Sequence, residues 1–275
     1  MSRPYAEVIG DPISHSKSPL IHNFWLRKLG IDAEYRSCHV RPDELADYFA
    51  QRRRDADWRG CNVTIPHKVA ALAFIDLPGA MVGAVGATNC IVPRDGKLGA
   101  DNTDIYGVGQ ALSHELDGVC VIGAGGAARA ALAALDQGLA SDIRIVARDC
   151  EKARADLSSD FKGLKFYSFR EVKAAMQGVR GVINASPLGM VGHAPMPGEV
   201  IDALEQTRSD AFTFDMVYAP LETDLLIGAR VRGRKPIDGL TMLISQASFA
   251  FRLFFGVFPD RNAKFSAELR ALLTA

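Results

Sequence analysis

The sequence predicts an α/β fold in two lobes, on the strength of two observations. Short apolar runs rich in β-branched residues alternate with segments of helical period along most of the 275 residues. That alternation is typical of parallel sheets covered by helices. After Gly239 the alternation stops and two helical stretches remain, at about 240–257 and 262–274. We expect these last helices to fold back and complete the N-terminal lobe, which would make that lobe discontinuous in sequence.

The first hundred residues predict a β-α-β-α-β domain with an added hairpin. Strands are expected at about 6–10, 33–40 and 60–63. Proline is well tolerated at the first helical position, so helices should begin at Pro19, at Pro42 and near Pro66. We expect the Ser18 hydroxyl to cap the first of these helices. Asp95-Gly96, between two apolar runs, predicts the hairpin turn because both residues tolerate positive φ.

The second lobe should begin with a helix at about 105–116 and continue as alternating strands and helices. The strands are expected near 119–123, 143–147, 164–168, 181–184 and 211–217. Gly123, Gly125 and Ala128 fit the pattern G-x-G-x-x-G/A between the first strand and its helix. In this pattern the glycines let backbone N–H groups reach a pyrophosphate at the helix N-terminus. A plain βα turn is the alternative, but the context favours a Rossmann-type dinucleotide-binding domain.

Composition argues against several other classes of protein. Lys plus Arg and Asp plus Glu both total 32, so no net charge suggests nucleic acid or an acidic membrane surface as a partner. No apolar run approaches the ~18 residues of a membrane helix, and the N-terminus lacks the apolar core of a signal peptide. The five cysteines are scattered and the six histidines occur singly. We therefore expect reduced thiols, a cytoplasmic location and no metal site, with monomer and homodimer both open.

Four polar clusters lie in predicted loops, where side chains are available to a ligand. They are residues 14–19, 62–68, 87–90 and 101–104. Turn and capping chemistry is the alternative for each of them. Lys68 is expected one turn into a helix, where the positive end of the dipole disfavours a charged ammonium and eases proton exchange. Together the clusters supply a cation, an anion and two amides from one lobe.

The motifs in these loops resemble those of shikimate dehydrogenase, and they occur in one order along almost the whole chain. They are Asp11-Pro12-Ile13 with His15-Ser16-Lys17-Ser18-Pro19, Asn62–Lys68, Asn102-Thr103-Asp104, Gly123–Arg129, Asn184–Met190, Asp215–Tyr218, and Asp238–Leu243 with Gln246. The resemblance implies a reversible hydride transfer between a nicotinamide cofactor and the ring carbon of shikimate or 3-dehydroshikimate, a step of aromatic amino-acid biosynthesis.

The same resemblance implies roles for individual residues. Lys68 and Asp104 would form the catalytic pair, with Lys68 exchanging a proton with the reacting oxygen and Asp104 holding the hydroxyls and the lysine in place. Ser16 and Ser18 would bind the substrate carboxylate. Contacts to the carboxylate or the ring hydroxyls would come from Thr64, Asn89, Tyr218 and Gln246. The substrate-binding and catalytic domain would comprise residues 1–103 plus 238–275, and the NADP-binding domain residues 104–237.

The cofactor preference depends on the residues that follow the second strand of the Rossmann-type domain. An acidic residue there favours the free 2′-OH of NAD, whereas arginine accommodates the 2′-phosphate of NADP. The chain offers both, as Arg148 and Asp149. Arg148 favours NADP, and Asp149 leaves NAD possible. The residues implied to bind cofactor are Gly123, Gly125, Gly126, Ala127, Arg148, Asp149, Lys152, Ser186, Met216 and Gly239.

Several positions depart from the family pattern. Thr88-Asn89-Cys90 stands where the family has Val-Asn-Thr, Asp149 stands in place of a hydroxyl residue, and Ile105 replaces a glycine after the implied catalytic aspartate. We expect the bulky Ile105 to reshape the nicotinamide pocket or the substrate end of the site. A relative that oxidises quinate or another cyclic polyol acid with NAD is therefore an alternative, as is a catalytically silent ligand sensor on the same fold.

Overall fold

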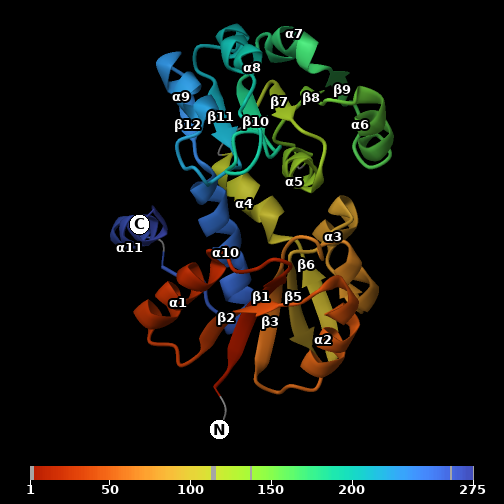
Figure 1. Ribbon diagram of the computed structural model, residues 1–275, viewed down its shortest axis with the longest axis vertical. Coiled ribbons are helices and arrows are strands. Elements are labelled where there is room, and N and C mark those ends of the chain that lie inside the picture. Colours follow the sequence, from red (N-terminus) through yellow and green to blue (C-terminus); the bar gives the residue numbers. More distant parts are fainter. Residues whose placement is uncertain (1–2, 113–115, 137, 261, 275) are drawn as a thin grey trace. The chain divides into compact units, whose positions relative to one another are not determined.

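The computed structural model describes residues 3–112, 116–136, 138–260 and 262–274 (Figure 1). The chain forms two compact units: unit 1 comprises Met1–Tyr106 and Ile244–Ala275, and unit 2 comprises Gly107–Leu243. Each unit contains one six-stranded sheet with helices, which confirms the predicted α/β class. The predicted domain boundaries, after residues 103 and 237, fall a few residues before the boundaries of these units. The assignment of substrate to one domain and of NADP to the other stays a prediction.

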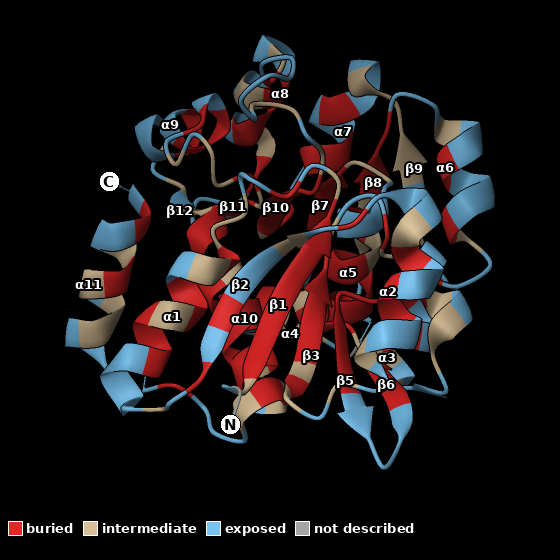
Figure 2. Ribbon diagram, turned by 60° about the horizontal axis from the view of Figure 1, so that its bottom comes forward, coloured by how far each residue is buried: buried red, intermediate tan, exposed pale blue. Residues whose placement is uncertain are grey.

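The sheet of unit 1 has the strand order β2-β1-β3-β5-β6-β4. Its strands are β1 (Tyr5–Gly10), β2 (Glu34–His39), β3 (Trp58–Val63), β4 (Leu77–Pro78), β5 (Cys90–Arg94) and β6 (Lys97–Asp101). β1 lies parallel between β2 and β3, and every one of its residues is buried (Figure 2). β5 and β6 form the predicted antiparallel hairpin, with positive φ at both Asp95 (51°) and Gly96 (77°). β4 was not predicted.

The helices of unit 1 cover this sheet, and some of them carry residues of the candidate site described below. They are α1 (Ser18–Leu29), α2 (Leu45–Arg52), α3 (Ala80–Val85) and α11 (Ala263–Thr274), with a 3-10 turn at Pro42–Glu44 before α2. α4 (Thr103–Ala111) and α10 (Gly239–Phe255) are divided by the unit boundaries. α11 contacts α1, as expected for a chain end that folds back onto the first domain. α3 was not predicted.

Two predicted helix starts are wrong in detail. Ser18 is the first residue of α1 rather than its cap, and the cap position belongs to Lys17, which makes no side-chain capping bond. The helix expected near Pro66 is absent: residues 65–69 form turns, and a 3-10 helix follows at Ala70–Phe74. Its bonds are the tight i→i−3 kind, such as Leu72 N–H to the Val69 carbonyl at 3.1 Å. A proline can begin a helix, but here the following residues close shorter hydrogen-bonded rings.

His22 of α1 is an ionisable group held in an apolar interior. Its ring stacks on Tyr35 with 4.0 Å between centroids, and neither ring nitrogen has a hydrogen-bond partner within the described residues. Burial lowers the pKa of His22 to about 3. The unfolded chain therefore takes up a proton below its ordinary pKa of about 6.5, whereas the folded chain does not do so until about pH 3.

This difference predicts a pH-dependent stability for unit 1. Between about pH 6.5 and pH 3 His22 should lower the free energy of unfolding by up to about 1.4 kcal/mol per pH unit as the solution is acidified. Urea unfolding followed by tryptophan fluorescence reports on this unit, because Trp25 and Trp58 are the only two tryptophans of the sequence and both lie in it. His22→Phe should remove the slope, and replacing the exposed His15 with asparagine should leave it. Equal slopes in all three proteins would contradict the prediction.

The sheet of unit 2 is parallel throughout, with the strand order β12-β11-β10-β7-β8-β9. Its strands are β7 (Val119–Ile122), β8 (Ile143–Val146), β9 (Lys165–Tyr167), β10 (Gly181–Asn184), β11 (Phe212–Asp215) and β12 (Lys235–Ile237). Counted from β7, this is the order 6-5-4-1-2-3 of a Rossmann-type domain, with its switch point between β7 and β10. The Rossmann-type prediction is confirmed, although β12 was not predicted.

The helices of unit 2 are α5 (Gly126–Leu135), α6 (Cys150–Leu157), α7 (Val172–Met176), α8 (Gly198–Ala203) and α9 (Asp224–Val231), with 3-10 turns at Phe169–Glu171 and Leu204–Gln206.

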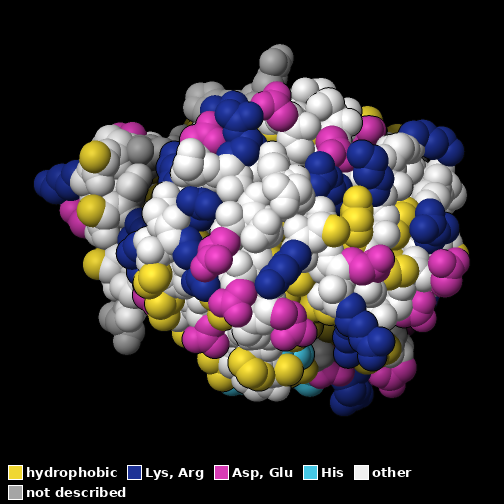
Figure 3. All heavy atoms as spheres, turned by 90° about the horizontal axis from the view of Figure 1, so that it is seen from above, with side chains coloured by type: hydrophobic (Ala, Val, Ile, Leu, Met, Phe, Trp, Pro, Cys, Tyr) yellow, Lys and Arg dark blue, Asp and Glu magenta, His cyan; other side chains and the backbone are white. Residues whose placement is uncertain are grey.

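Positive and negative side chains are interspersed over the face drawn in Figure 3. All five cysteines are free thiols. Among the described residues, no helix is long and apolar enough to span a membrane, and no acidic, cysteine and histidine side chains gather as a metal site.

Candidate active site

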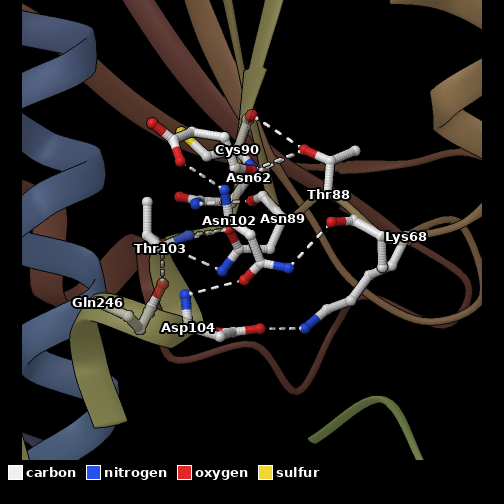
Figure 4. Close-up of polar contacts among 11 residues, drawn as sticks. Asn62, Lys68, Thr88, Asn89, Cys90, Asn102, Thr103, Asp104 and Gln246 are labelled. Carbon is white, nitrogen blue, oxygen red and sulfur yellow. Dashed lines mark hydrogen bonds and ion pairs between the residues drawn. The ribbon is translucent and has the colours of Figure 1, made fainter. Parts of the chain in front are cut away.

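The two residues predicted to act together, Lys68 and Asp104, form an ion pair in unit 1. Lys68 Nζ lies 2.6 Å from Asp104 Oδ2 (Figure 4). The side chains are 35% and 17% exposed, so the pair is partly shielded yet open to a small molecule. A cation and a carboxylate at this distance form a charge-assisted hydrogen bond, in which each group fixes the other.

Asp104 is held at the beginning of α4 by the residues that precede it. Its backbone N–H donates to Asn102 Oδ1 at 3.2 Å, and Asn102 Nδ2 in turn donates to the Ala87 carbonyl at 3.0 Å. Asn102 is 3% exposed. The side chain of Asn102 therefore ties the start of α4 to the segment before β5, and Asp104 stands in the first turn, where a carboxylate suits the helix dipole.

Lys68 is held through its backbone and its neighbour rather than by a helix. Its carbonyl accepts the Thr88 N–H at 2.9 Å, and the buried His67 donates from Nε2 to the Val40 carbonyl at 2.6 Å. The Thr88 hydroxyl is fully buried and donates to the Asp101 carbonyl at 2.8 Å. Thr88, one of the departures from the family pattern, thus connects the turn that carries Lys68 to the strand that leads to Asp104.

A row of hydrogen-bonded side chains lies behind the pair. Asn89 Oδ1 accepts the Thr103 N–H at 2.7 Å, and Asn89 Nδ2 donates to Thr103 Oγ1 at 3.0 Å. Thr103 Oγ1 also contacts Gln246 Oε1 of α10 at 3.1 Å. Asn89 and Gln246 are 3% and 8% exposed. Both predicted substrate contacts are therefore oriented by Thr103, for which no role was predicted.

The remaining predicted substrate residues of unit 1 follow β1 and β3. Ser16 Oγ accepts the Ser18 N–H at 3.3 Å, so the two serines share one turn. A Cβ on Gly10 would lie 2.6 Å from Thr64 Cγ2, and glycine at that position therefore lets Thr64 approach the end of β1. Lys17, between the serines, donates from Nζ to the Leu273 carbonyl near the end of α11.

A separate pocket of about 630 Å³ lies in unit 2, at the carboxyl ends of β10, β7, β8 and β9. It is lined by Gly123, Ala124, Gly125, Val146, Ala147, Arg148, Asp149, Lys152, Ala153, Asp156, Phe169, Ala185, Ser186, Pro187, Leu188, His193 and Ala194. Gly123 has φ 110°, and a Cβ there would lie 3.0 Å from the Ala185 carbonyl oxygen. A Cβ on Gly125 or Gly126 would meet open space, and no side chain caps α5.

Charged residues gather at the β8 side of this pocket. Arg148 is exposed, and its guanidinium makes no hydrogen bond or ion pair with any described residue. Asp149 Oδ1 accepts the Lys152 N–H at 2.9 Å and so caps α6. Lys152 Nζ pairs with Asp156 Oδ2 at 3.0 Å. Arg148, Asp149 and Lys152 therefore line one pocket, as predicted. The Asp149 carboxylate, however, is engaged as the N-cap of α6.

Comparison with known proteins identifies the family. Residues 8–91 match the family model for the shikimate dehydrogenase substrate binding domain. A shikimate dehydrogenase (NADP(+)) of Sphingopyxis alaskensis is 48% identical over 276 residues, covering 99% of this chain and 97% of that protein. The chain belongs to the shikimate dehydrogenase family.

Solved structures of related shikimate dehydrogenases have the same fold over the whole chain. The shikimate dehydrogenase of Thermus thermophilus, solved with NADP(H) and shikimate, is 30% identical, with a TM-score of 0.84 over 98% of this chain and 99% of that one. A quinate dehydrogenase of Corynebacterium glutamicum, solved with NAD, is 26% identical and also has a TM-score of 0.84, over 99% of each chain. Both polyol chemistries therefore occur on this fold.

One further hydrogen-bond network of unit 2, around Asp215 and Asn184, was not predicted. Asp215 is fully buried and accepts hydrogen bonds from Asn184 Nδ2 (2.9 Å), the Val217 N–H (3.0 Å) and Thr223 Oγ1 (2.7 Å). Burial raises the pKa of this carboxyl. Asn184 Oδ1 also accepts from Ser186 Oγ at 2.7 Å, so one network fixes the loops that carry Ser186, Met216 and Tyr218.

Two other predicted positions are constrained by packing. A Cβ on Gly239 would lie 2.5 Å from the Val217 carbonyl, and glycine is needed for this close approach whatever ligand is bound. Ile105 of α4 is 3% exposed. The expectation that Ile105 reshapes the nicotinamide pocket or the substrate end of the site stays a prediction.

Proposed function

We propose that this chain catalyses the reversible NADP-dependent reduction of 3-dehydroshikimate to shikimate, with Lys68 and Asp104 as the catalytic pair. The observation that carries this proposal is the 2.6 Å contact between Lys68 Nζ and Asp104 Oδ2 on a partly exposed surface of unit 1. Membership of the family supports the overall reaction, and the geometry supports the assignment of these two residues.

The pair suits the reduction of a ketone. NADPH, when bound, supplies the hydride. The Lys68 ammonium donates a hydrogen bond to the ketone oxygen and transfers a proton to it as negative charge develops, and in the reverse direction the neutral amine takes the hydroxyl proton. Asp104 keeps Lys68 in one orientation and accepts a hydrogen bond from a ring hydroxyl.

The other predicted contacts suit a small polyol that carries a carboxylate. Ser16, Ser18 and Thr64 offer hydroxyl donors to the carboxylate, from the turns that follow β1 and β3. Asn89 and Gln246 offer amide groups to the ring hydroxyls. After its bond to Thr103, Asn89 Nδ2 keeps one N–H for a ligand. We also assign Tyr218 of unit 2 to substrate binding, on its motif alone.

The pocket of unit 2 fits NADP. Gly123, Gly125, Gly126 and Ala127 surround the open N-terminus of α5, which suits a pyrophosphate. Ser186 and Met216 belong to the loops fixed around Asn184 and Asp215, and Gly239 begins α10 close to the Val217 carbonyl. We assign all three to the nicotinamide side. The Arg148 guanidinium is free to bind the 2′-phosphate of NADP, whereas the Asp149 carboxylate caps α6. Both observations support NADP over NAD.

Replacing Arg148 with alanine tests the cofactor assignment. We expect the KM for NADP+ to rise about tenfold, because one charge-assisted contact to a phosphate is lost. The KM for NAD+ should change less than about twofold, since NAD has no 2′-phosphate. Initial rates with both cofactors measure this, and Arg170→Ala, an exposed arginine outside the pocket, is the control. An equal loss for both cofactors would argue against the assignment.

A quinate dehydrogenase activity with NAD is the second candidate, favoured by the quinate dehydrogenase of Corynebacterium glutamicum, which was solved with NAD and has the same fold. Initial rates with shikimate and quinate, each with NAD+ and NADP+, distinguish the two. Binding of cofactor without turnover of either polyol would indicate a ligand sensor instead. We further propose a cytoplasmic monomer or homodimer that binds neither nucleic acid nor membranes, which size-exclusion chromatography and cell fractionation can test.

A further inference from the structure

A surface ion pair on α6 lies in the wall of the proposed cofactor pocket. Lys152 and Asp156 occupy positions i and i+4 of this helix, and both line the pocket together with Arg148. Lys152 Nζ is 3.0 Å from Asp156 Oδ2, and the side chains are 71% and 47% exposed. Arg148 and Lys152 bring two positive charges to this end of the pocket, whereas Asp149 and Asp156 bring two negative ones.

The two acidic residues differ in what they are engaged in. Asp149 accepts the Lys152 N–H and holds the beginning of α6, which is a structural role. Asp156 makes no such cap through its carboxylate; its backbone carbonyl accepts from Arg129 Nη1 at 2.8 Å, which fixes this turn of α6 against α5. The carboxylate of Asp156 is therefore held in the pocket wall, with Lys152 as its partner.

A 2′-phosphate would meet opposing effects at this position. It is attracted by Arg148 and by Lys152, but Lys152 is already paired, and the phosphate and Asp156 repel each other across the same wall. A 2′-hydroxyl carries no charge and experiences neither effect. The pair thus weakens the binding of a phosphorylated ribose specifically.

We propose that Asp156 is a specificity-determining residue, which by pairing with Lys152 narrows the preference of this pocket for NADP over NAD. This inference rests on the proposed cofactor site, and it identifies Asp156 as a residue that affects the cofactor preference of that site. Lys152 adds a second positive charge to the pocket beside that of Arg148, and its pairing with Asp156 weakens its attraction for the 2′-phosphate. Removing the carboxylate frees Lys152 for the 2′-phosphate.

The test measures binding rather than turnover, so that it does not depend on the proposed reaction. Calorimetry gives the Kd of 2′,5′-ADP, which carries the 2′-phosphate, and of 5′-AMP, which lacks it, for the full chain and its variants. Asp156→Asn should tighten 2′,5′-ADP roughly three- to tenfold at low ionic strength and leave 5′-AMP within about twofold. The gain should shrink as salt is added, because both side chains are exposed.

Two further variants make the result specific. Glu151→Gln removes an acidic residue of the same helix that does not line the pocket, and it should change neither Kd. Lys152→Met should weaken 2′,5′-ADP, and in that background Asp156→Asn should have less than about half of its effect on the Kd, since pairing is the cause. An unchanged Kd ratio in Asp156→Asn, or an equal gain without Lys152, would overturn the inference. The proposed reaction would be unaffected, since it fails only if no polyol is turned over.

Discussion

Replacing Lys68 with methionine is expected to lower kcat for shikimate oxidation by about three orders of magnitude, because a positioned proton-transfer group contributes about 10²–10⁴ to a rate. Methionine keeps most of the length of the side chain and removes only the nitrogen that contacts Asp104. The KM for shikimate should change much less, since its carboxylate and hydroxyls are assigned to other residues. Steady-state rates from reduced-nicotinamide absorbance measure both constants.

Lys28→Met is the matched control for this prediction. Lys28 is also a half-exposed lysine of unit 1 in contact with a carboxylate: its Nζ is 2.5 Å from Glu268 Oε2, and the side chains are 34% and 37% exposed. It therefore reports the loss of a lysine–carboxylate pair outside the proposed site, and its kcat should stay within about twofold of the parent chain. If Lys68→Met kept most of the activity while folded, the assignment of Lys68 would be wrong.

Arginine at position 68 separates charge from proton transfer. Arg keeps the positive charge beside Asp104, but it does not release a proton in the accessible pH range. If the charge alone stabilised the developing alkoxide, Lys68→Arg would retain much of kcat. Because we assign a proton transfer to this nitrogen, we expect Lys68→Arg to be nearly as slow as Lys68→Met.

Features that depend on neighbouring residues were predictable from the sequence. The hairpin turn at Asp95-Gly96 requires only two residues that accept positive φ, and both have it. The glycine loop after β7 is a similar case, since Gly123 combines a positive φ with a close approach to Ala185. The parallel sheet of unit 2 followed from the alternation of strands and helices, because parallel strands need crossover connections.

Features that depend on competition between local rules were harder to predict. The rule that proline begins helices gave Lys68 a place in a helix, yet the turn around it is set by hydrogen bonds from His67 and Thr88. Asp149 could have been identified as a helix cap, because an aspartate three residues before the Lys152 N–H is a known capping signal.

The hydrogen-bond networks behind both sites join residues that are distant in sequence. Asn89 and Gln246 meet through Thr103, and Asn184 meets Asp215 across two adjacent strands. The second contact joins the ends of parallel neighbours, so a predicted strand order could have indicated it. The first involves the last helices of the chain, and nothing local specifies how α10 packs on unit 1.

The second large effect is expected on stability, at a buried charge of unit 1. Glu7 of β1 is fully buried, and its carboxylate accepts hydrogen bonds from Tyr48 (2.8 Å) and from Arg52 Nε (2.6 Å). A third contact comes from Arg36 Nε at 3.3 Å. Removing Arg52 leaves a buried carboxylate with only the longer contact to a positive charge, and a buried charge that loses its partner destabilises a protein by several kcal/mol.

We therefore expect Arg52→Met to lower the free energy of unfolding of unit 1 by about 3 kcal/mol. Urea unfolding monitored by the fluorescence of Trp25 and Trp58 measures this, since both tryptophans lie in unit 1. Arg41→Met is the control, because Arg41 Nη2 is also 2.6 Å from a carboxylate, Glu44, but the side chains are 59% and 43% exposed. That variant should lose less than about 1 kcal/mol.

A double variant distinguishes an unpaired charge from a loss of packing. Glu7→Gln removes the charge that Arg52→Met leaves behind, so the pair of substitutions should be more stable than Arg52→Met alone by about 1–2 kcal/mol. If the arginine contributed only the packing of its stem against Tyr48, over which its guanidinium lies at 4.8 Å, the two substitutions would add. Additive losses would therefore refute the electrostatic account, and a partial recovery would show that Arg52 of α2 stabilises the buried carboxylate of β1 as a counter-charge.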